Sequence, residues 1–202
     1  MSRSSRLYLA VGVLVGLAAS VPALAAAFDA FKTFCVETDG TADLIAAAAK
    51  RQFWFSAPEA EISDFRREGW VTQGFTDVQS GVGKSTFYDL VVSSTPLEQT
   101  PQGGVMIDIS FCMVISTRPD GSIDAELSAL IGPGIRSPDG ARTWLYSRSG
   151  GQVVEESGLY GASPATLRAA WMDRSIYMVT LPSEPGPQGA GAVLIAQRRP
   201  GS

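Results

Sequence analysis

Two cysteines are the residues of this chain whose chemistry is easiest to interpret. Cys35 precedes an alanine-rich segment, and Cys112 lies within the apolar stretch 103–117. Two cysteines in a chain with an export signal, described below, usually form one disulfide, because exported proteins fold in an oxidising compartment. Two separate buried thiols are the alternative. A catalytic cysteine is disfavoured, since the chain has no histidine that could activate a thiol.

Asp108 is the second candidate, because it places a charge in the middle of the apolar stretch 103–117. Its functional interpretation is a site carboxylate, and the alternative that we favour is a solvated or arginine-paired group. Acids also lie close in sequence in two pairs, Asp124 with Glu126 and Glu155 with Glu156. Glycoside hydrolysis, however, depends on the separation of two carboxylates in space, which sequence does not give. We therefore assign no catalytic residue, metal ligand or cofactor, and keep Asp108 as the one residue to test.

The segment GVGKST at 81–86 is similar to the end of a phosphate-binding loop, but it fails as one. That motif needs a glycine five positions before Gly83, where this chain has Val78, and it needs a helix afterwards. A flexible turn into a strand is the better interpretation. We also expect no nucleic-acid partner, because the net charge is −4 and no run of Lys or Arg exceeds two residues.

Residues 1–25 have the pattern of a secretory signal peptide. Arg3 and Arg6 precede an apolar run, and Ala23 and Ala25 form a small-x-small site after a proline. We predict cleavage after Ala25, with an uncleaved membrane anchor as the alternative. No later apolar run is long enough to span a bilayer, so we expect no stable membrane insertion after cleavage.

The rest of the chain, 26–202, has the length of one domain with a hydrophobic core, located in the periplasm or secreted. The stretch 103–117 predicts its central strand, because apolar residues recur at every second position. We expect the odd-numbered face of that strand to be fully buried and the even-numbered face to be partly covered. The odd-numbered face carries Val105, Ile107, Ile109, Phe111, Met113 and Ile115.

The other elements follow from apolar spacing and from turn residues. Thr41 is a predicted N-cap, Ser56 and Glu59 resemble a capping box, and Ser122 is a third predicted cap. Helices are expected over 28–36, 42–53, 59–68 and 123–132, and strands over 85–94, 103–117, 141–147, 152–156 and 191–198.

Two segments have two competing interpretations each. The segment 70–75 is either a strand or a loop. In 164–181, either Pro164 opens a short helix or two strands form a hairpin about Asp173 and Arg174, and we favour the hairpin. Together these elements predict an α+β domain with one antiparallel sheet of about five to seven strands, two or three helices packed on it, and one disulfide.

Between Phe34 and Trp54 the chain resembles a family of small exported bacterial proteins of uncharacterised function. The shared features are a Cys-x-x-Thr-x-Gly-type start at 35–40, an alanine-rich helix, and a second cysteine, Cys112, in a strand in mid-chain. The resemblance implies a single domain with a disulfide, and it implies no activity.

Three hypotheses for function follow. The first is a non-catalytic binding or envelope accessory domain whose partner is an envelope protein, in an oligomeric state that the sequence leaves open. The second is a hydrolase that acts on envelope material through Asp or Glu, and the third is an inhibitor or immunity protein for another exported protein. An exposed apolar patch would favour binding or inhibition, whereas a pocket that joins Asp108 to a second carboxylate would favour the enzyme.

Overall fold

The computed structural model describes residues 26–66, 70–77, 89–96, 100–102, 105–117, 123–184 and 190–198. The predicted cleavage site at Ala23 and Ala25, the segment 81–86 and the predicted cap Ser122 lie outside these ranges. Within them, no helix is both long and apolar enough to cross a bilayer.

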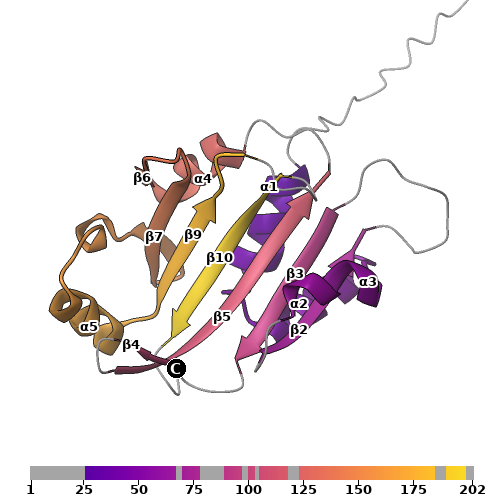
Figure 1. The fold of residues 1–202 in the computed structure, drawn as a ribbon, viewed down its shortest axis with the longest axis horizontal. Coiled ribbons are helices and arrows are strands. Elements are labelled where there is room, and N and C mark those ends of the chain that lie inside the picture. The colour runs from indigo at the N-terminus through magenta and orange to yellow at the C-terminus, as the bar shows by residue number, and fades with distance from the viewer. Residues whose placement is uncertain are drawn as a thin grey trace, which may run out of the picture.

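A single antiparallel sheet of nine strands organises the described part of the chain, and a short tenth strand, β4, pairs with one end of β5 (Figure 1). The order is β1-β2-β3-β5-β10-β9-β7-β6, and β8 pairs with β7. The strands are β1 Phe55–Ser56, β2 Trp70–Thr76, β3 Asp89–Pro96, β4 Thr100–Gln102, β5 Val105–Ser116, β6 Ile135–Arg136, β7 Arg142–Ser149, β8 Gln152–Glu155, β9 Ile176–Leu181 and β10 Ala190–Arg198. The sheet exceeds the predicted five to seven strands because β1 and β6, at its two ends, are two-residue strands with no periodicity to detect.

Five α-helices accompany the sheet, rather than the predicted two or three. They are α1 Ala26–Phe31, α2 Ala42–Arg51, α3 Glu59–Ile62, α4 Ile123–Ile131 and α5 Pro164–Asp173. A π-helical turn, η1 Lys32–Val36, continues α1, and the 3-10 turns η2 Ser63–Phe65 and η3 Ser157–Leu159 follow α3 and β8.

β5 is the central strand that its periodicity predicts, with β3 on one side and β10 on the other. The expectation about its two faces is wrong. Ser110, Cys112 and Val114, on the even-numbered face, are almost completely buried. Phe111 and Met113, on the odd-numbered face, are only half-buried. The small even-numbered side chains let the N-terminal helices approach the sheet closely, so this face carries the thicker layer.

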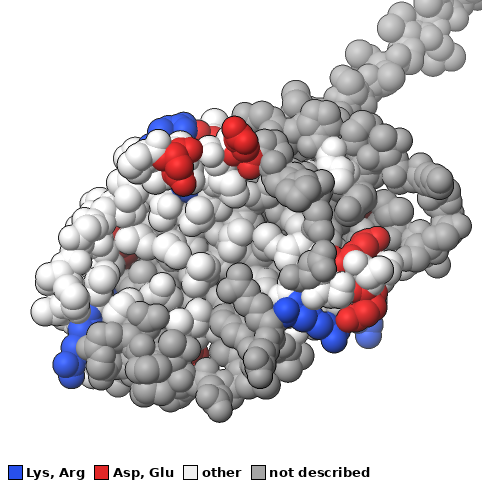
Figure 2. Space-filling model, in the orientation of Figure 1, with Lys and Arg blue, Asp and Glu red and all other residues white. Residues whose placement is uncertain are grey.

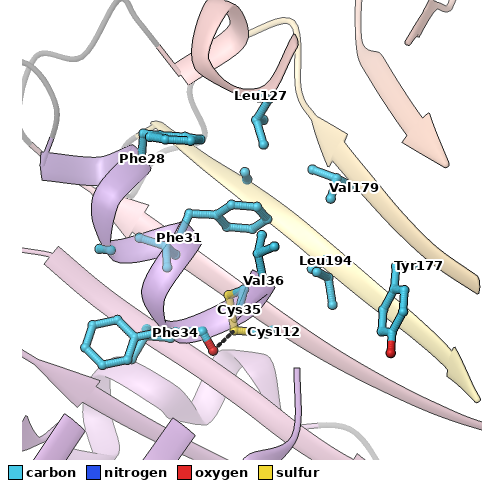
Figure 3. Packing of buried hydrophobic residues seen from close by; sticks show 14 of the residues in the cluster. Phe28, Phe31, Phe34, Cys35, Val36, Cys112, Leu127, Tyr177, Val179 and Leu194 are labelled. Carbon is cyan, nitrogen blue, oxygen red and sulfur yellow. Dashed lines mark hydrogen bonds between the residues drawn. A yellow bond between two sulfur atoms is a disulfide. The ribbon is translucent and has the colours of Figure 1, made fainter. Parts of the chain in front are cut away.

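The main core lies between the even-numbered face of β5 and the N-terminal helices (Figure 3). Phe31 and Phe34 are fully buried there, and Leu127 of α4 and Leu194 of β10 pack into the same cluster. On the opposite face, α3 and η2 contribute Ile62 and Phe65 to one smaller cluster, and α5 contributes Leu167, Ala170 and Trp171 to another.

The segment 164–181 forms a helix and a strand, so the hairpin that we favoured is wrong. Pro164 occupies the first helical position of α5, and the Ser163 hydroxyl accepts a hydrogen bond from the amide of Thr166. Both features are strong helix-start signals. β9 then begins at Ile176.

Two predicted caps are also wrong in detail. Ser56 belongs to β1, and the N-cap position of α3 is Pro58 without any side-chain cap, so the predicted capping box does not form. Thr41 does hold the N-cap position of α2, but its hydroxyl accepts a hydrogen bond from Arg198 instead of capping the helix.

The helix predicted at 123–132 and the strands predicted at 141–147, 152–156 and 191–198 are present as α4, β7, β8 and β10. β7 and β8 form the expected hairpin, with Ser149 paired to Gln152. Its two connecting residues, Gly150 and Gly151, both have positive φ angles, which is the conformation of the tight turns that suit hairpins.

Candidate functional site

Cys35 and Cys112 form a disulfide, as predicted, with their Cα atoms 5.4 Å apart. The bond joins η1 to the centre of β5, and both cysteines are fully buried (Figure 3). Such burial excludes the pair from surface thiol chemistry and gives it a structural role.

Asp108 lies near one end of β5, half-buried, directly opposite Arg198 of β10. The guanidinium of Arg198 does not turn toward it. Instead it donates to the Ser110 hydroxyl, to the Thr41 hydroxyl and to the carbonyl of Asp39. Among the described residues, no group of three or more His, Cys, Asp or Glu side chains could hold a metal ion.

The paired acids of the sequence do not face each other across a cleft. Asp124 forms ion pairs with Arg136 and Arg142. Glu155 accepts from the Gly134 amide, whereas Glu156 binds Arg174 through both of its oxygens at 2.7 Å. The hydrogen bonds from Arg174 lower the pKa of Glu156 despite its partial burial. These carboxylates therefore join elements of the fold.

A second polar cluster fastens the turn that follows η1. Asp39 has a left-handed backbone, with φ of 54°, and its carboxylate accepts from Arg148 of β7 at 2.6 Å. Arg148 also donates to the carbonyl of Val36, and Arg198 donates to the carbonyl of Asp39. Two arginines from the sheet thus bind carbonyl groups at the end of the helical turn, where the Val36 carbonyl also accepts from the amide of Asp39.

Tyr146 lies beside this cluster with its ring stacked on Tyr177 at 4.9 Å. Burial raises the pKa of the Tyr146 phenol, and its hydroxyl has no hydrogen-bond partner among the described residues. We expect Tyr146→Phe to leave the free energy of unfolding unchanged or to raise it by up to about 1 kcal/mol, because an unpaired buried hydroxyl is costly. Urea unfolding followed by circular dichroism measures the change.

Tyr160→Phe is the matched control, since the Tyr160 hydroxyl accepts from the Leu145 amide at 2.9 Å. The free energy of unfolding of that variant should be about 1 kcal/mol lower than that of the wild type. A larger loss in Tyr146→Phe than in the control would contradict the assignment of an unpaired hydroxyl.

The described surface holds an open groove of about 560 Å³ beside the edge strand β1. Its lining residues come from α2, β1, β2 and the segment between α2 and β1, at the end of the sheet opposite β6. Figure 1 shows α2 and β2 at this end of the sheet. We call it the aromatic groove. It is lined by Ala46, Lys50, Phe53, Trp54, Phe55, Ser56 and Phe75.

The aromatic residues of the groove differ in how firmly they are held. Trp54 is half-buried and packs on Phe34 with ring centroids 4.4 Å apart, and Phe75 packs on the edge of the main core. Phe53 is 85% exposed and Phe55 is 40% exposed. The groove therefore has a fixed aromatic floor and an exposed aromatic rim.

The backbone explains why Phe53 points outward. The amide of Trp54 donates to the carbonyl of Ala49, and the amide of Phe53 donates to that of Lys50. This pair of hydrogen bonds is the Schellman motif that ends many helices. In this motif the residue after the C-cap adopts a left-handed conformation and is normally glycine. Phe53 occupies that position with φ of 59°. A bulky side chain there is strained, and it buries little surface in return.

Charge at the groove is basic although the whole chain is acidic. Lys50 lines the groove, Arg51 is adjacent and exposed, and neither forms an ion pair with any described residue. The nearest acids along the chain are Asp43, in the first turn of α2, and Glu59, which is paired with Arg66 at 2.9 Å. Figure 2 shows basic side chains next to the acidic ones in the region of α2 and α3.

Sequence reasoning did not identify this groove. The run Phe53-Trp54-Phe55 stands at the end of the predicted helix 42–53, where bulky apolar residues fit a buried core as well as a binding surface. The missing signal was the pairing of β1 with β2, which leaves the run on an open sheet edge.

Comparison of the chain with protein-family models, with curated proteins and with solved structures finds no match in any of the three.

Proposed function

We propose that this protein is an exported, non-catalytic binding domain that holds part of another envelope protein in the aromatic groove. The observation that carries the proposal is Phe53, a large aromatic side chain that is 85% exposed on a left-handed backbone. Backbone strain of this kind costs of order 1–3 kcal/mol and is concentrated at functional positions.

Three further features support binding over catalysis. Three of the acids that lie in pairs along the sequence, Asp124, Glu155 and Glu156, are engaged with arginines or with a backbone amide. The groove itself offers aromatic surface, one hydroxyl and one amine, Lys50, without a carboxylate. Exposed aromatic side chains beside a basic group are typical of binding surfaces.

The test is capture of partners from the envelope fraction, quantified by mass spectrometry, with the wild type and with Phe53→Asn. Asparagine tolerates the left-handed conformation, so the backbone is preserved while the ring is removed. We expect the wild type to retain a partner in stoichiometric amount and Phe53→Asn to retain at least about tenfold less, as for loss of a buried aromatic anchor.

Val154→Asn is the control, because Val154 is an exposed apolar residue far from the groove in the strand order. It belongs to β8, which pairs with β7 near the end of the sheet opposite β1. It should retain the partner fully. Equal recovery with Phe53→Asn and with the wild type would remove the basis of the proposed function.

A further inference from the structure

Ser56 presents a peptide group at the lip of the aromatic groove that pairs with no strand in the part of the chain that the structure describes. β1 pairs with β2 in the register Phe55 to Thr76 and Ser56 to Phe75, and the amide of Ala57 donates to the carbonyl of Gly74. In an antiparallel pair, hydrogen-bonded and non-hydrogen-bonded positions alternate. Ser56 therefore occupies a non-hydrogen-bonded position, and its N–H and C=O point away from β2, toward the open edge.

We propose that the occupant of the aromatic groove is an extended segment of a partner protein that pairs with Ser56 as an added edge strand. The segment carries a large apolar side chain and, two positions away, an acidic one. This inference rests on the proposed function and adds the chemistry of the partner.

The apolar position follows from the pleat of the sheet. Residues that lie directly opposite each other on neighbouring strands share a face. Ser56 lies opposite Phe75, and both line the groove. The partner residue that pairs with Ser56 therefore directs its side chain to the same face, over Phe75 and between Phe53 and Trp54. A phenylalanine, leucine or methionine suits this aromatic surface.

The acidic position follows from charge. Side chains two positions apart along a strand also share a face. Lys50 lines the groove from α2 and has no ion-pair partner among the described residues. A carboxylate two positions from the apolar side chain is therefore on the correct face to meet Lys50. The same basic rim argues against a second copy of this chain, because a two-fold contact at β1 would bring Lys50 and Arg51 toward their own copies.

The edge itself has few of the usual defences against strand addition. Natural edge strands are protected by charges, prolines or bulges. β1 consists of an exposed phenylalanine and an exposed serine, and its first proline, Pro58, comes after the paired residues. Its short length limits the contact to about one pair of hydrogen bonds, so the aromatic anchor must supply most of the affinity.

The probe is a short threonine-rich peptide with a phenylalanine and, two positions later, an aspartate, labelled and titrated by fluorescence polarisation. We expect saturable binding to the full chain. N-methylation of the phenylalanine amide removes a donor that pairs with the edge and should weaken binding at least about tenfold. Moving the aspartate next to the phenylalanine places it on the other face and should weaken binding about threefold, the value of one exposed ion pair.

Two variants of the protein complete the test. Ser56→Pro removes the outward amide and no sheet hydrogen bond, so it should weaken peptide binding about tenfold with an unchanged unfolding midpoint. Lys50→Glu should weaken binding of the peptide that carries aspartate. The same variant should bind more tightly a peptide in which lysine replaces that aspartate. Unchanged binding by Ser56→Pro, or equal binding of the N-methylated peptide, overturns the strand-addition proposal.

The outcomes separate the two proposals. If the peptide does not bind while Phe53→Asn still loses its envelope partner, the groove binds another kind of structure. In that case the strand-addition inference is wrong and the proposed function stands. If the wild type forms a dimer by light scattering that Phe53→Asn abolishes, a second copy is the occupant and the inference also falls. If Phe53→Asn retains its partner, the proposed function itself is contradicted, and the inference that rests on it is contradicted as well.

Discussion

Replacement of both Cys35 and Cys112 by alanine is expected to lower the free energy of unfolding by about 4 kcal/mol. The two cysteines are 77 positions apart in sequence. A bond that closes a loop of this length removes a large amount of chain entropy from the unfolded state, worth about 4 kcal/mol in the loop-closure model. For a chain of this size, the midpoint of thermal unfolding should fall by about 10 °C.

The measurement is urea unfolding of the wild type and of the double variant, each with and without reductant. The reduced wild type should be nearly as unstable as the double variant, and reductant should leave the double variant unchanged. A double variant within about 1 kcal/mol of the oxidised wild type would show that helix packing alone fastens the N-terminal segment.

The disulfide also supports the proposed site through one packing contact. Cys35 is adjacent to Phe34, and the ring of Phe34 supports Trp54, part of the floor of the aromatic groove. Loss of the covalent bond therefore acts on the segment that positions this floor. The polar cluster of Asp39, Arg148 and Arg198 fastens the same segment at its other end. The N-terminal helices are thus fixed to the sheet both covalently and by ion pairing.

The disulfide and the central strand were predictable because each leaves a simple trace in the sequence. Two cysteines have only one intramolecular pairing, and strict alternation over 103–117 has only one regular interpretation. Which face of that strand is more deeply buried was not predictable from hydrophobicity. Ser110 and Cys112 are less apolar than Phe111 and Met113, yet they are buried because small side chains allow helices to pack closely.

The mistaken hairpin at 164–181 has a different cause. The apolar residues there fit the 3.6-residue period of a helix as well as the two-residue period of a strand. The dipeptide Asp173-Arg174 resembled a turn between two strands. Local chemistry decides the outcome, since Ser163 caps the helix and Pro164 sits where a proline costs nothing. Short strands such as β1 cannot be predicted from apolar periodicity, because two residues are too few to show an alternating pattern. The aromatic groove depends on β1, and for this reason the site was missed although all of its aromatic residues were visible.

Phe53→Gly is expected to raise the free energy of unfolding by about 1 kcal/mol while it abolishes binding at the aromatic groove. Phe53 has φ of 59°, at the helix-ending position where glycine is the residue without steric cost. Its ring is 85% exposed, so its removal sacrifices little buried surface. The strain relieved, about 1–2 kcal/mol for a left-handed residue, exceeds the extra chain entropy that glycine loses on folding.

Phe53→Ala separates these effects, because it removes the ring equally but keeps a side chain at positive φ. Its unfolding midpoint should stay close to that of the wild type, whereas Phe53→Gly should unfold about 3 °C higher. Both variants should lose binding to the same extent, at least about tenfold, because both lack the ring. A glycine variant less stable than the alanine variant would mean that the Phe53 backbone is unstrained. Stability and binding that change in opposite directions at one residue are the signature expected of a side chain retained for a partner.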